Sequence, residues 1–289
     1  MEEIIKKADI LIEALPYIQK FYGKTVVVKY GGAAMTSEEI RADTLQDIVF
    51  MNFIGMHPIL VHGGGPLITR EMHEMGKTPQ FLDGIRVTDE ETIKIVKKVL
   101  NSINNELVSE IISLGSKAKG LGGGKKNIFK IKKKEAKIDV GNVGVITEVD
   151  IKPIKRLLKK KIIPVIMPLS IGEDGQLYNI NADEVAFSLA QALCAEKLVL
   201  LTNVKGILTD KDDEASLIHT LNVKEARDLM HRDIIQHGMI PKVKACVKAL
   251  NSGVVKTHII DGRITHSVLL EIFTDEGVGT EIVRGKIQK

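Results

Sequence analysis

The chain has 289 residues, of which 44% are hydrophobic and 27% are charged, and its formal net charge at pH 7 is +4. This composition is typical of a soluble globular protein, and two cysteines are too few for a disulfide framework or a cysteine metal cluster. No apolar run approaches the ~18 residues that span a bilayer, and the acidic start lacks the apolar run of a signal peptide. We therefore expect a cytoplasmic protein without a membrane partner, in which Cys194 and Cys246 are reduced thiols of the core.

At the start of the chain, apolar residues recur every three or four positions between residues 4 and 18. This spacing predicts an amphipathic helix over residues 1–22, which Pro16 should kink or interrupt. Such a helix either packs on its own domain or contacts another subunit.

Short apolar runs then alternate with helical patterns. The predicted strands cover residues 25–30, 58–62, 162–168, 197–202 and 257–261, and the predicted helices cover 37–55, 89–114, 182–195 and 241–252. This alternation indicates an α/β protein, an open three-layer αβα sandwich with a mainly parallel central sheet. Residues 130–150 instead predict antiparallel hairpins around Gly141 and Gly144. Because no Pro/Gly/Ser linker divides the chain, we expect two lobes on one continuous sheet.

Residues 117–137 hold nine lysines and one glutamate. A surface that binds nucleic acid would interleave stacking aromatic residues, and only Phe129 is available here. The favoured interpretation is a solvated loop and hairpin, with no nucleic-acid partner.

Two glycine turns follow predicted strands, at Lys29-Tyr30-Gly31-Gly32 and at residues 62–66, HGGGP. Ligands of open α/β sheets bind at the carboxyl ends of the strands. Glycine lets the backbone approach an anion closely, and a following helix adds its positive N-terminal end. Together the turns favour an anion site.

Sequence motifs of other enzyme classes are each incomplete in this chain. Gly23-Lys24-Thr25 and Gly76-Lys77-Thr78 match the end of the phosphate-loop pattern G-x-x-x-x-G-K-[ST], but Ile18 and Glu71 stand where its first glycine is required. The dinucleotide-binding pattern G-x-G-x-x-G and the nucleophile-elbow pattern G-x-S-x-G do not occur. The zinc-protease pattern that begins at His73 fails at Lys77. What remains is a phosphate-handling site made of glycines and lysines, without a metal of its own.

Two further segments suit such a site. Period-two spacing puts Asn179, Asn181 and Asp183 on one side of an extended segment, and Asn181 is a candidate helix N-cap. Lys242 lies in the first turn of a predicted helix, where a lysine is usually unfavourable unless it faces an anion.

These features resemble those of the N-acetyl-L-glutamate kinases of the amino acid kinase superfamily. The segments that carry the resemblance run from about residue 24 to 283: VVVKYGGAAM (26–35), PILVHGGGP (58–66), DGIRVTDEET (83–92), DVGNVGVI (139–146), YNINADEVA (178–186), LLTNVKGIL (200–208), GMIPKVKAC (238–246) and HIIDGRITHSVLLEIFTDEGVGT (258–280). The GIRVT segment is similar to the acetylglutamate-binding motif, and related kinases differ there.

The resemblance implies that MgATP phosphorylates the γ-carboxylate of N-acetyl-L-glutamate in arginine synthesis, with the metal held mainly by the nucleotide phosphates. It implies that Lys29 and Lys242 stabilise the transition state and that Asp183 orients them. The other residues that it implies are Gly31, Gly32 and Gly63 for phosphate; Gly64, Gly65, Arg86 and Asn179 for acetylglutamate; and Thr202, Asn203, Val204, Gly206 and Leu208 for the nucleotide.

The added N-terminal helix resembles that of the arginine-inhibited subgroup, in which paired helices link three dimers into a hexamer. His258, Glu271 and Gly277 are similar to arginine-site residues of that subgroup, and Tyr17 is a weaker match. The implied organisation is an oligomerisation helix over 1–22, a lobe over 23–177 that binds acetylglutamate and dimerises, and a lobe over 178–289 that binds ATP. Binding of a nitrogen-signalling PII protein stays open.

Two alternatives also stay open. One is another kinase of this fold, of the glutamate 5-kinase, aspartokinase or carbamate kinase type. The other is a catalytically weak arginine sensor that acts through a protein partner, against which the presence of Lys29, Asp183 and Lys242 argues.

Overall fold

A computed structural model describes residues 1–35, 37–82, 84–124, 128–136, 138–210, 212–235, 239–275 and 277–285. Its helices are α1 (Glu2–Phe21), α2 (Glu38–Phe53), α3 (Gly65–Glu74), α4 (Glu90–Ser113), α5 (Lys152–Lys159), α6 (Ala182–Ala192), α7 (Val223–His231), α8 (Met239–Asn251) and α9 (Ser267–Phe273). Its strands are β1 (Thr25–Tyr30), β2 (His57–His62), β3 (Phe81–Leu82), β4 (Ile85–Arg86), β5 (Lys117–Leu121), β6 (Phe129–Lys133), β7 (Gly144–Val149), β8 (Ile162–Ile166), β9 (Leu169–Ile171), β10 (Leu177–Asn179), β11 (Lys197–Thr202), β12 (Thr220–Asn222), β13 (Lys256–Asp261) and β14 (Thr280–Val283). Two short 3₁₀ helices, η1 (Gly32–Met35) and η2 (Glu214–Ser216), complete the set.

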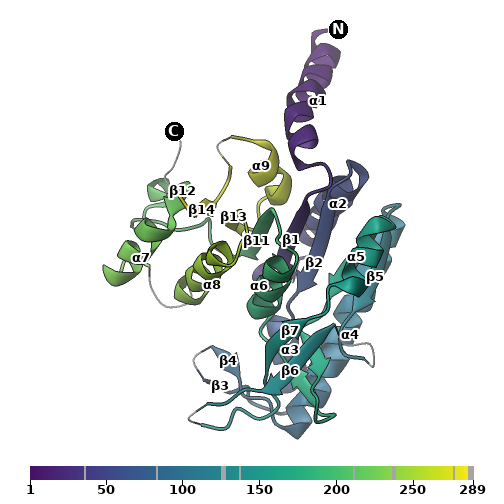
Figure 1. Cartoon of the computed structure of the whole chain (residues 1–289), viewed down its shortest axis with the longest axis vertical. Coiled ribbons are helices and arrows are strands. Elements are labelled where there is room, and N and C mark those ends of the chain that lie inside the picture. The colour runs from purple at the N-terminus through teal and green to yellow at the C-terminus, as the bar shows by residue number, and fades with distance from the viewer. Residues whose placement is uncertain are drawn as a thin grey trace.

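The central sheet has the strand order β12-β14-β13-β11-β1-β2-β8-β5 (Figure 1). Neighbouring strands are parallel, except that β13 and β14 pair antiparallel. The predicted α/β class with a mainly parallel sheet is therefore confirmed, as are the predicted strands and helices, whose observed bounds differ from the expected ones by a few residues.

Alternating side chains of β1 enter two separate cores. Val27 belongs to a core that α5, α6, α7 and α8 share, whereas Val26 and Val28 belong to a core that α2, α3, α4 and α9 share. Since successive side chains of a strand point to opposite faces, helices cover both faces of the sheet. The strands β1, β2, β8 and β5 come from residues 25–166 and the other four from residues 197–283, so the two halves of the chain meet where β1 pairs with β11.

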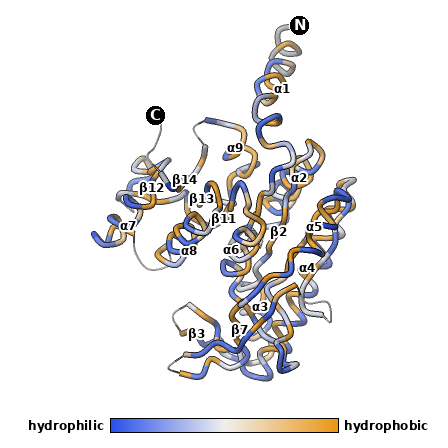
Figure 2. The backbone as a smooth tube through the Cα atoms, in the orientation of Figure 1, coloured by the Kyte–Doolittle hydropathy of each residue, from blue (hydrophilic) through white to orange (hydrophobic). Residues whose placement is uncertain are grey.

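Helix α1 projects from the body of the molecule (Figures 1 and 2), and the described part of the chain leaves several of its apolar residues exposed. Pro16 does not interrupt it. Its exposed apolar residues are Ile5, Ile10, Leu11, Ile12 and Leu15. Its C-terminal end is anchored, because Phe21 is buried and Tyr17 contacts the ring of Phe273 in α9.

Two expectations need correction. Part of the lysine-rich segment is β5, the edge strand of the central sheet, and not loop; β6 and β7 form the expected hairpin, whereas residues 125–127 and 137 lie outside the described ranges. Cys246 is buried, but Cys194 is exposed. It follows the end of α6 with a φ of 48°, so it belongs to the turn that leaves the helix.

In the described part of the chain, no helix combines the length and the hydropathy that crossing a membrane requires.

Candidate functional site

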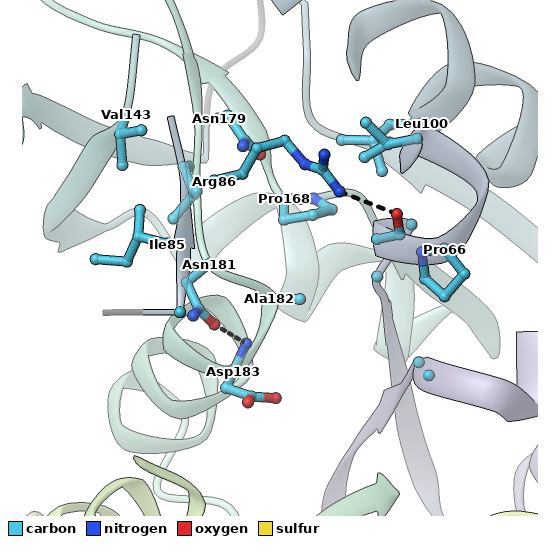
Figure 3. Close-up of a pocket in the computed structure, with 18 of the residues that line it drawn as sticks. Pro66, Ile85, Arg86, Leu100, Val143, Pro168, Asn179, Asn181, Ala182 and Asp183 are labelled. Carbon is cyan, nitrogen blue, oxygen red and sulfur yellow. Dashed lines mark hydrogen bonds between the residues drawn. The ribbon is translucent and has the colours of Figure 1, made fainter. Parts of the chain in front are cut away.

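A cavity of about 270 Å³ lies at the carboxyl ends of β1 and β2 (Figure 3). We refer to it as the central cavity. Its wall includes most of the site residues expected from the sequence: Lys29, Gly31, Gly32, Gly63, Gly64, Gly65, Arg86, Asn179 and Asp183. These residues are separated by up to 154 positions in the chain and meet because β1 and β2 are neighbours in the sheet, with α6 packed against both.

Asp183 holds the two expected lysines together. Lys29 Nζ, at the end of β1, lies 3.1 Å from Asp183 Oδ1, and Lys242 Nζ, from the first turn of α8, donates to Oδ2 at 3.3 Å. Burial acts to raise the pKa of Asp183, but the two adjacent ammonium groups outweigh it and hold the pKa below its ordinary value. The carboxylate is therefore charged at neutral pH and lies between two cations. Lys29 and Asp183 line the central cavity, whereas Lys242 is not among the lining residues and reaches the site through Asp183.

The glycine turns supply space and donors. A Cβ on Gly31 would lie 2.8 Å from Lys29 Nζ, and one on Gly64 would lie 2.7 Å from a methyl carbon of Leu100. Gly64 is the N-cap of α3, so the first N–H groups of that helix, which lack intrahelical partners, start at the cavity wall. The N–H of Gly63 is already used, because it donates to the carbonyl oxygen of Tyr30 at 2.8 Å. Gly63 therefore lines the cavity without a free N–H group to offer a phosphate.

Arg86 brings a buried positive charge to the opposite side of the cavity. Figure 3 shows Arg86 among the residues that line the cavity. Its Nη2 donates to Gly65 O at 3.1 Å and to Thr69 Oγ1 at 2.8 Å, and its guanidinium lies 4.7 Å from the ring centroid of Phe81. Burial lowers its pKa from the ordinary value. Among the ion pairs of the described residues, none involves Arg86, so the guanidinium suits an anionic ligand.

The segment from β10 to α6 completes the wall. Asn179 Nδ2 donates to Thr88 Oγ1 at 3.3 Å, and Asn181 caps α6 by accepting from Asp183 N at 2.8 Å. The predicted N-cap is therefore confirmed, and the cap places Asp183 in the first turn of α6 (Figure 3).

A second cavity, of about 530 Å³, lies between the end of β11 and the start of α8, and we refer to it as the β11–α8 cavity. Val204, Gly206 and Leu208 line it. The wall also contains the apolar residues Ile207, Ile234 and Ile235 and the polar residues Thr209, Asp210 and Asp233. Thr202 and Asn203 do not: Thr202 is buried, and its hydroxyl accepts from Val204 N, whereas Asn203 is exposed. Met239 also lines this cavity and precedes Lys242 by three residues on α8, so this helix connects the cavity to the lysine pair.

A third cavity, of about 130 Å³, lies between α1 and α9, and we refer to it as the α1–α9 cavity. Tyr17, Glu271 and Gly277 line it. His258 lies behind the wall and is 1% exposed, with Nδ1 2.7 Å from Glu271 Oε1 and Nε2 3.0 Å from Lys197 Nζ.

Several residues of these sites escape sequence reasoning. They are Phe81 under Arg86, the His62–Asn104 pair behind the second glycine turn, and Lys20, Lys197 and Lys256 in the α1–α9 cavity. For His62, the sequence offers one indication of a special role, namely a polar residue at the end of an otherwise apolar strand. Three residues of the quoted motifs lie outside the described ranges: Asp83, Gly238 and Glu276. Within those ranges, no group of three or more His, Cys, Asp or Glu side chains is arranged to hold a metal ion.

The comparison with known families agrees with the fold described above. Residues 24–261 match the model of the amino acid kinase family, and the chain belongs to that family.

Its relatives narrow the class further. The chain is 51% identical to the acetylglutamate kinase of Thermoanaerobacter pseudethanolicus over 96% of this chain and 93% of that protein. It is 51% identical to the acetylglutamate kinase of Moorella thermoacetica over 97% of this chain and 98% of that protein.

Solved structures share the fold. N-acetylglutamate synthase from Neisseria gonorrhoeae, complexed with coenzyme A and N-acetyl-glutamate, superposes with a TM-score of 0.86 at 26% identity, over 96% of this chain and 63% of that one. Carbamate kinase from Giardia lamblia superposes with a TM-score of 0.66 at 16% identity, over 91% of this chain and 99% of that one, a likeness of fold alone.

Proposed function

We propose that this chain transfers the γ-phosphoryl group of ATP to the γ-carboxylate of N-acetyl-L-glutamate, forming N-acetyl-L-glutamyl 5-phosphate for arginine biosynthesis. The observation that carries the proposal is the Lys29–Asp183–Lys242 arrangement at one edge of a cavity whose opposite side presents Arg86. Two relatives at 51% identity bear the name of this activity.

The chemistry needs few groups. A carboxylate is already a nucleophile and requires no general base, so catalysis rests on alignment and on neutralisation of charge. Lys29 and Lys242 would stabilise the charge that builds up on the phosphoryl oxygens, while Asp183 binds both ammonium groups and orients them. Backbone N–H groups of the glycine turns, chiefly at Gly32 and Gly64, would supply further donors.

Substrates divide between the halves of the chain. We assign acetylglutamate to residues 23–177, where the fork of Arg86 suits a carboxylate and Asn179 reaches across from the second half. We assign ATP to residues 178–289, with the adenosine in the β11–α8 cavity and the phosphates directed along α8 toward Lys242. The magnesium ion would enter with the nucleotide phosphates. Use of ATP favours a cytoplasmic location.

Regulation by arginine is a second part of the proposal. The α1–α9 cavity presents carboxylates of Glu271, Glu281 and Asp275, which suit a guanidinium and an ammonium group. Lys20 and Lys256 line the same cavity and suit an α-carboxylate. Because Tyr17 of α1 donates to Asp275 at 2.6 Å, occupancy of this cavity would act on α1, which we propose links dimers into a hexamer.

A coupled assay of ADP release tests the proposal. We expect turnover with N-acetyl-L-glutamate and little with glutamate, aspartate or carbamate, and we expect added L-arginine to inhibit. Preference for an unacetylated amino acid or for carbamate would reassign the chain to another kinase of this fold. Absence of turnover with all four, together with arginine binding, would favour the sensor, and a pull-down with a PII protein would then become informative.

A further inference from the structure

His62 and Asn104 form a buried polar pair behind the second glycine turn, and the chemistry proposed above does not use them. His62 ends β2 and is fully buried, and Asn104 of α4 is 2% exposed. Imidazole Nδ1 lies 2.8 Å from Gly63 O, and imidazole Nε2 lies 3.0 Å from Asn104 Nδ2. Asn104 Nδ2 also donates to Val165 O at 3.1 Å. Burial of polar side chains is costly, so a fully bonded pair here specifies one geometry.

These partners determine which ring nitrogen of His62 carries the proton. A carbonyl oxygen only accepts, so the nitrogen of the Asn104 carboxamide must face Val165 O, and its second N–H then faces imidazole Nε2. Nε2 must therefore accept, and the proton lies on Nδ1, which donates to Gly63 O. Burial lowers the pKa of His62 to about 4, so the ring is neutral at pH 7.

Space for the carboxamide comes from the neighbouring edge strand. A Cβ on Gly120 of β5 would lie 2.0 Å from Asn104 Oδ1. Only glycine at that position leaves room for the carboxamide, which is a reason for a glycine in the middle of a strand.

The carbonyl that accepts from His62 belongs to the same peptide group as the N–H of Gly64. In a trans peptide group the C=O and the N–H point in opposite directions, so a carbonyl turned toward the His62 ring turns the N–H of Gly64 away from it. The preceding peptide group is held as well, since Gly63 N donates to Tyr30 O. Gly64 lines the central cavity and caps α3, whereas His62 does not line it.

We propose that His62 and Asn104 are positioning residues that hold the Gly63–Gly64 peptide group so that the N–H of Gly64 faces the anion in the central cavity. The chain of donors runs from Asn104 through His62 and the Gly63 carbonyl to the Gly64 N–H, and each bond polarises the next. The inference rests on the proposed function only for the identity of that anion.

The protonation state is the first test, and it needs no turnover. The full-length protein labelled with ¹⁵N at histidine is examined by NMR between about pH 6 and pH 8, and the His62 signals are identified by their loss in His62→Asn. We expect a neutral ring with the proton on Nδ1 throughout this range. A ring protonated on Nε2, or an imidazolium, overturns the proposal. Because the measurement is independent of substrate, failure of the proposed kinase activity leaves this result interpretable.

Substitution of His62 separates positioning from simple packing. His62→Asn keeps an N–H donor near the place of Nδ1, whereas His62→Leu has a similar volume and no donor. We expect His62→Leu to lower kcat by about tenfold or more with the KM for ATP within about twofold, and His62→Asn to recover most of the loss. A folded His62→Leu protein with full kcat, or an Asn variant no better than the Leu variant, overturns the proposal.

Asn104→Asp gives a test through pH. A carboxylate facing Nε2 draws the proton of the neutral ring to Nε2 and raises the pKa of His62, so Nδ1–H persists only while the ring is an imidazolium. The kcat of Asn104→Asp should therefore fall as pH rises through this raised pKa, whereas the wild type and the exposed neighbour variant Asn105→Asp show no such step. An Asn104→Asp profile that matches Asn105→Asp contradicts the proposal.

Discussion

Around Asp183, one carboxylate serves two lysines that come from opposite halves of the chain. Lys29 is 9% exposed and Lys242 is only partly exposed, so water screens neither charge fully. A low-dielectric setting of this kind strengthens the interaction of both lysines with an added phosphoryl group. Their individual contributions to catalysis can be measured by substitution.

Lys242→Ala should lower kcat by roughly 10²–10³-fold and leave the KM for acetylglutamate within a fewfold, because the charge of Lys242 matters most as the phosphoryl group transfers. Steady-state kinetics checks this, with Lys244→Ala, an exposed lysine two residues further along α8, as the matched control. A near-normal kcat for Lys242→Ala would remove this residue from the mechanism.

Arg86→Lys should mainly raise the KM for acetylglutamate. An ammonium group cannot reproduce the two-pronged fork that a guanidinium offers to a carboxylate. The KM for ATP should change little, and Arg70→Lys, at an exposed position of α3, should change neither value. If the KM for ATP rises instead, the assignment of substrates to the two halves is reversed.

Lys197 should cost stability at neutral pH. Burial lowers its pKa from 10.5 to about 8, so between these values the unfolded chain binds a proton that the folded chain does not, and the free energy of unfolding rises with pH across this range. Lys197→Met should remove this rise and raise the free energy of unfolding at pH 7 by up to about 3 kcal/mol. Urea unfolding at a series of pH values measures both effects, with Lys159→Met, at an exposed position of α5, as the control.

An unchanged or lower stability of Lys197→Met at pH 7 would contradict this account. A gain in stability would mean that the chain keeps a buried lysine beside His258 at a cost, which is typical of a ligand site and supports the proposed role of the α1–α9 cavity.

Helices α8 and α1 differ in how firmly the rest of the chain holds them. Helix α8 supplies Lys242 in its first turn and buries Val243, Cys246 and Val247 behind it, so the lysine stands on a rigid base. Helix α1 is attached by its last turns only, where Phe21 is 4% exposed and Tyr17 donates to Asp275. Further toward its N-terminus, Ile5, Ile10, Leu11, Ile12 and Leu15 are exposed.

Deletion of residues 1–15 should reduce a hexamer to dimers and weaken inhibition by arginine, while kcat stays near that of the full chain. The exposed apolar residues of α1 need a cover, and a second copy of this helix is the proposed one. The cut spares Tyr17 and Phe21, because removal of residues 1–22 would also take a buried core residue. Sedimentation of the truncated protein measures its oligomeric state, and an arginine titration of its activity measures its inhibition. A truncated protein that stays hexameric and fully sensitive to arginine would return α1 to a purely intramolecular role.

Across the whole molecule, the proposed active site spans the line where β1 pairs with β11. The two halves contribute Lys29 and Lys242, and Asp183 is the ion-pair partner of both. The site therefore also joins the halves, and its electrostatics should affect stability.

Asp183→Asn should lower the free energy of unfolding at pH 7 by about 1–3 kcal/mol and reduce kcat strongly, because two partly buried ammonium groups would then face each other without an anion. The pKa of Asp183 is depressed in the fold, so its contribution is present above the ordinary pKa and is lost as pH falls through the folded one. The difference between the two proteins should therefore shrink in acid. Urea unfolding measures it, and Asp228→Asn, at an exposed position of α7, is the control. Equal stability of Asp183→Asn and wild type at pH 7 would show that the ion pairs do not join the halves.

Much of this architecture could be predicted from the sequence because the signals are local. The apolar run of β1, the two glycine turns and the cap at Asn181 each follow from a few neighbouring residues, and the structure contains all three. Short strands such as β12 and β14 have no such signal, since three or four residues form a strand only when a partner strand is present. The exposure of Cys194 was mispredicted because the residue at which α6 ends depends on tertiary packing, which the local sequence does not show.

The sequence by itself determined the α/β alternation and the chemical types at the site, glycine, lysine, aspartate and arginine, since these depend on composition and spacing. Only the tertiary structure decided which of them meet. The contact between Lys242 and Asp183 spans 59 residues, and that between Asn104 and His62 spans 42. It also showed that Gly63 has no N–H to offer, because Tyr30 O takes it. Hydrogen bonds and ion pairs act over a few ångströms in space, and the fold brings such distant residues within that range.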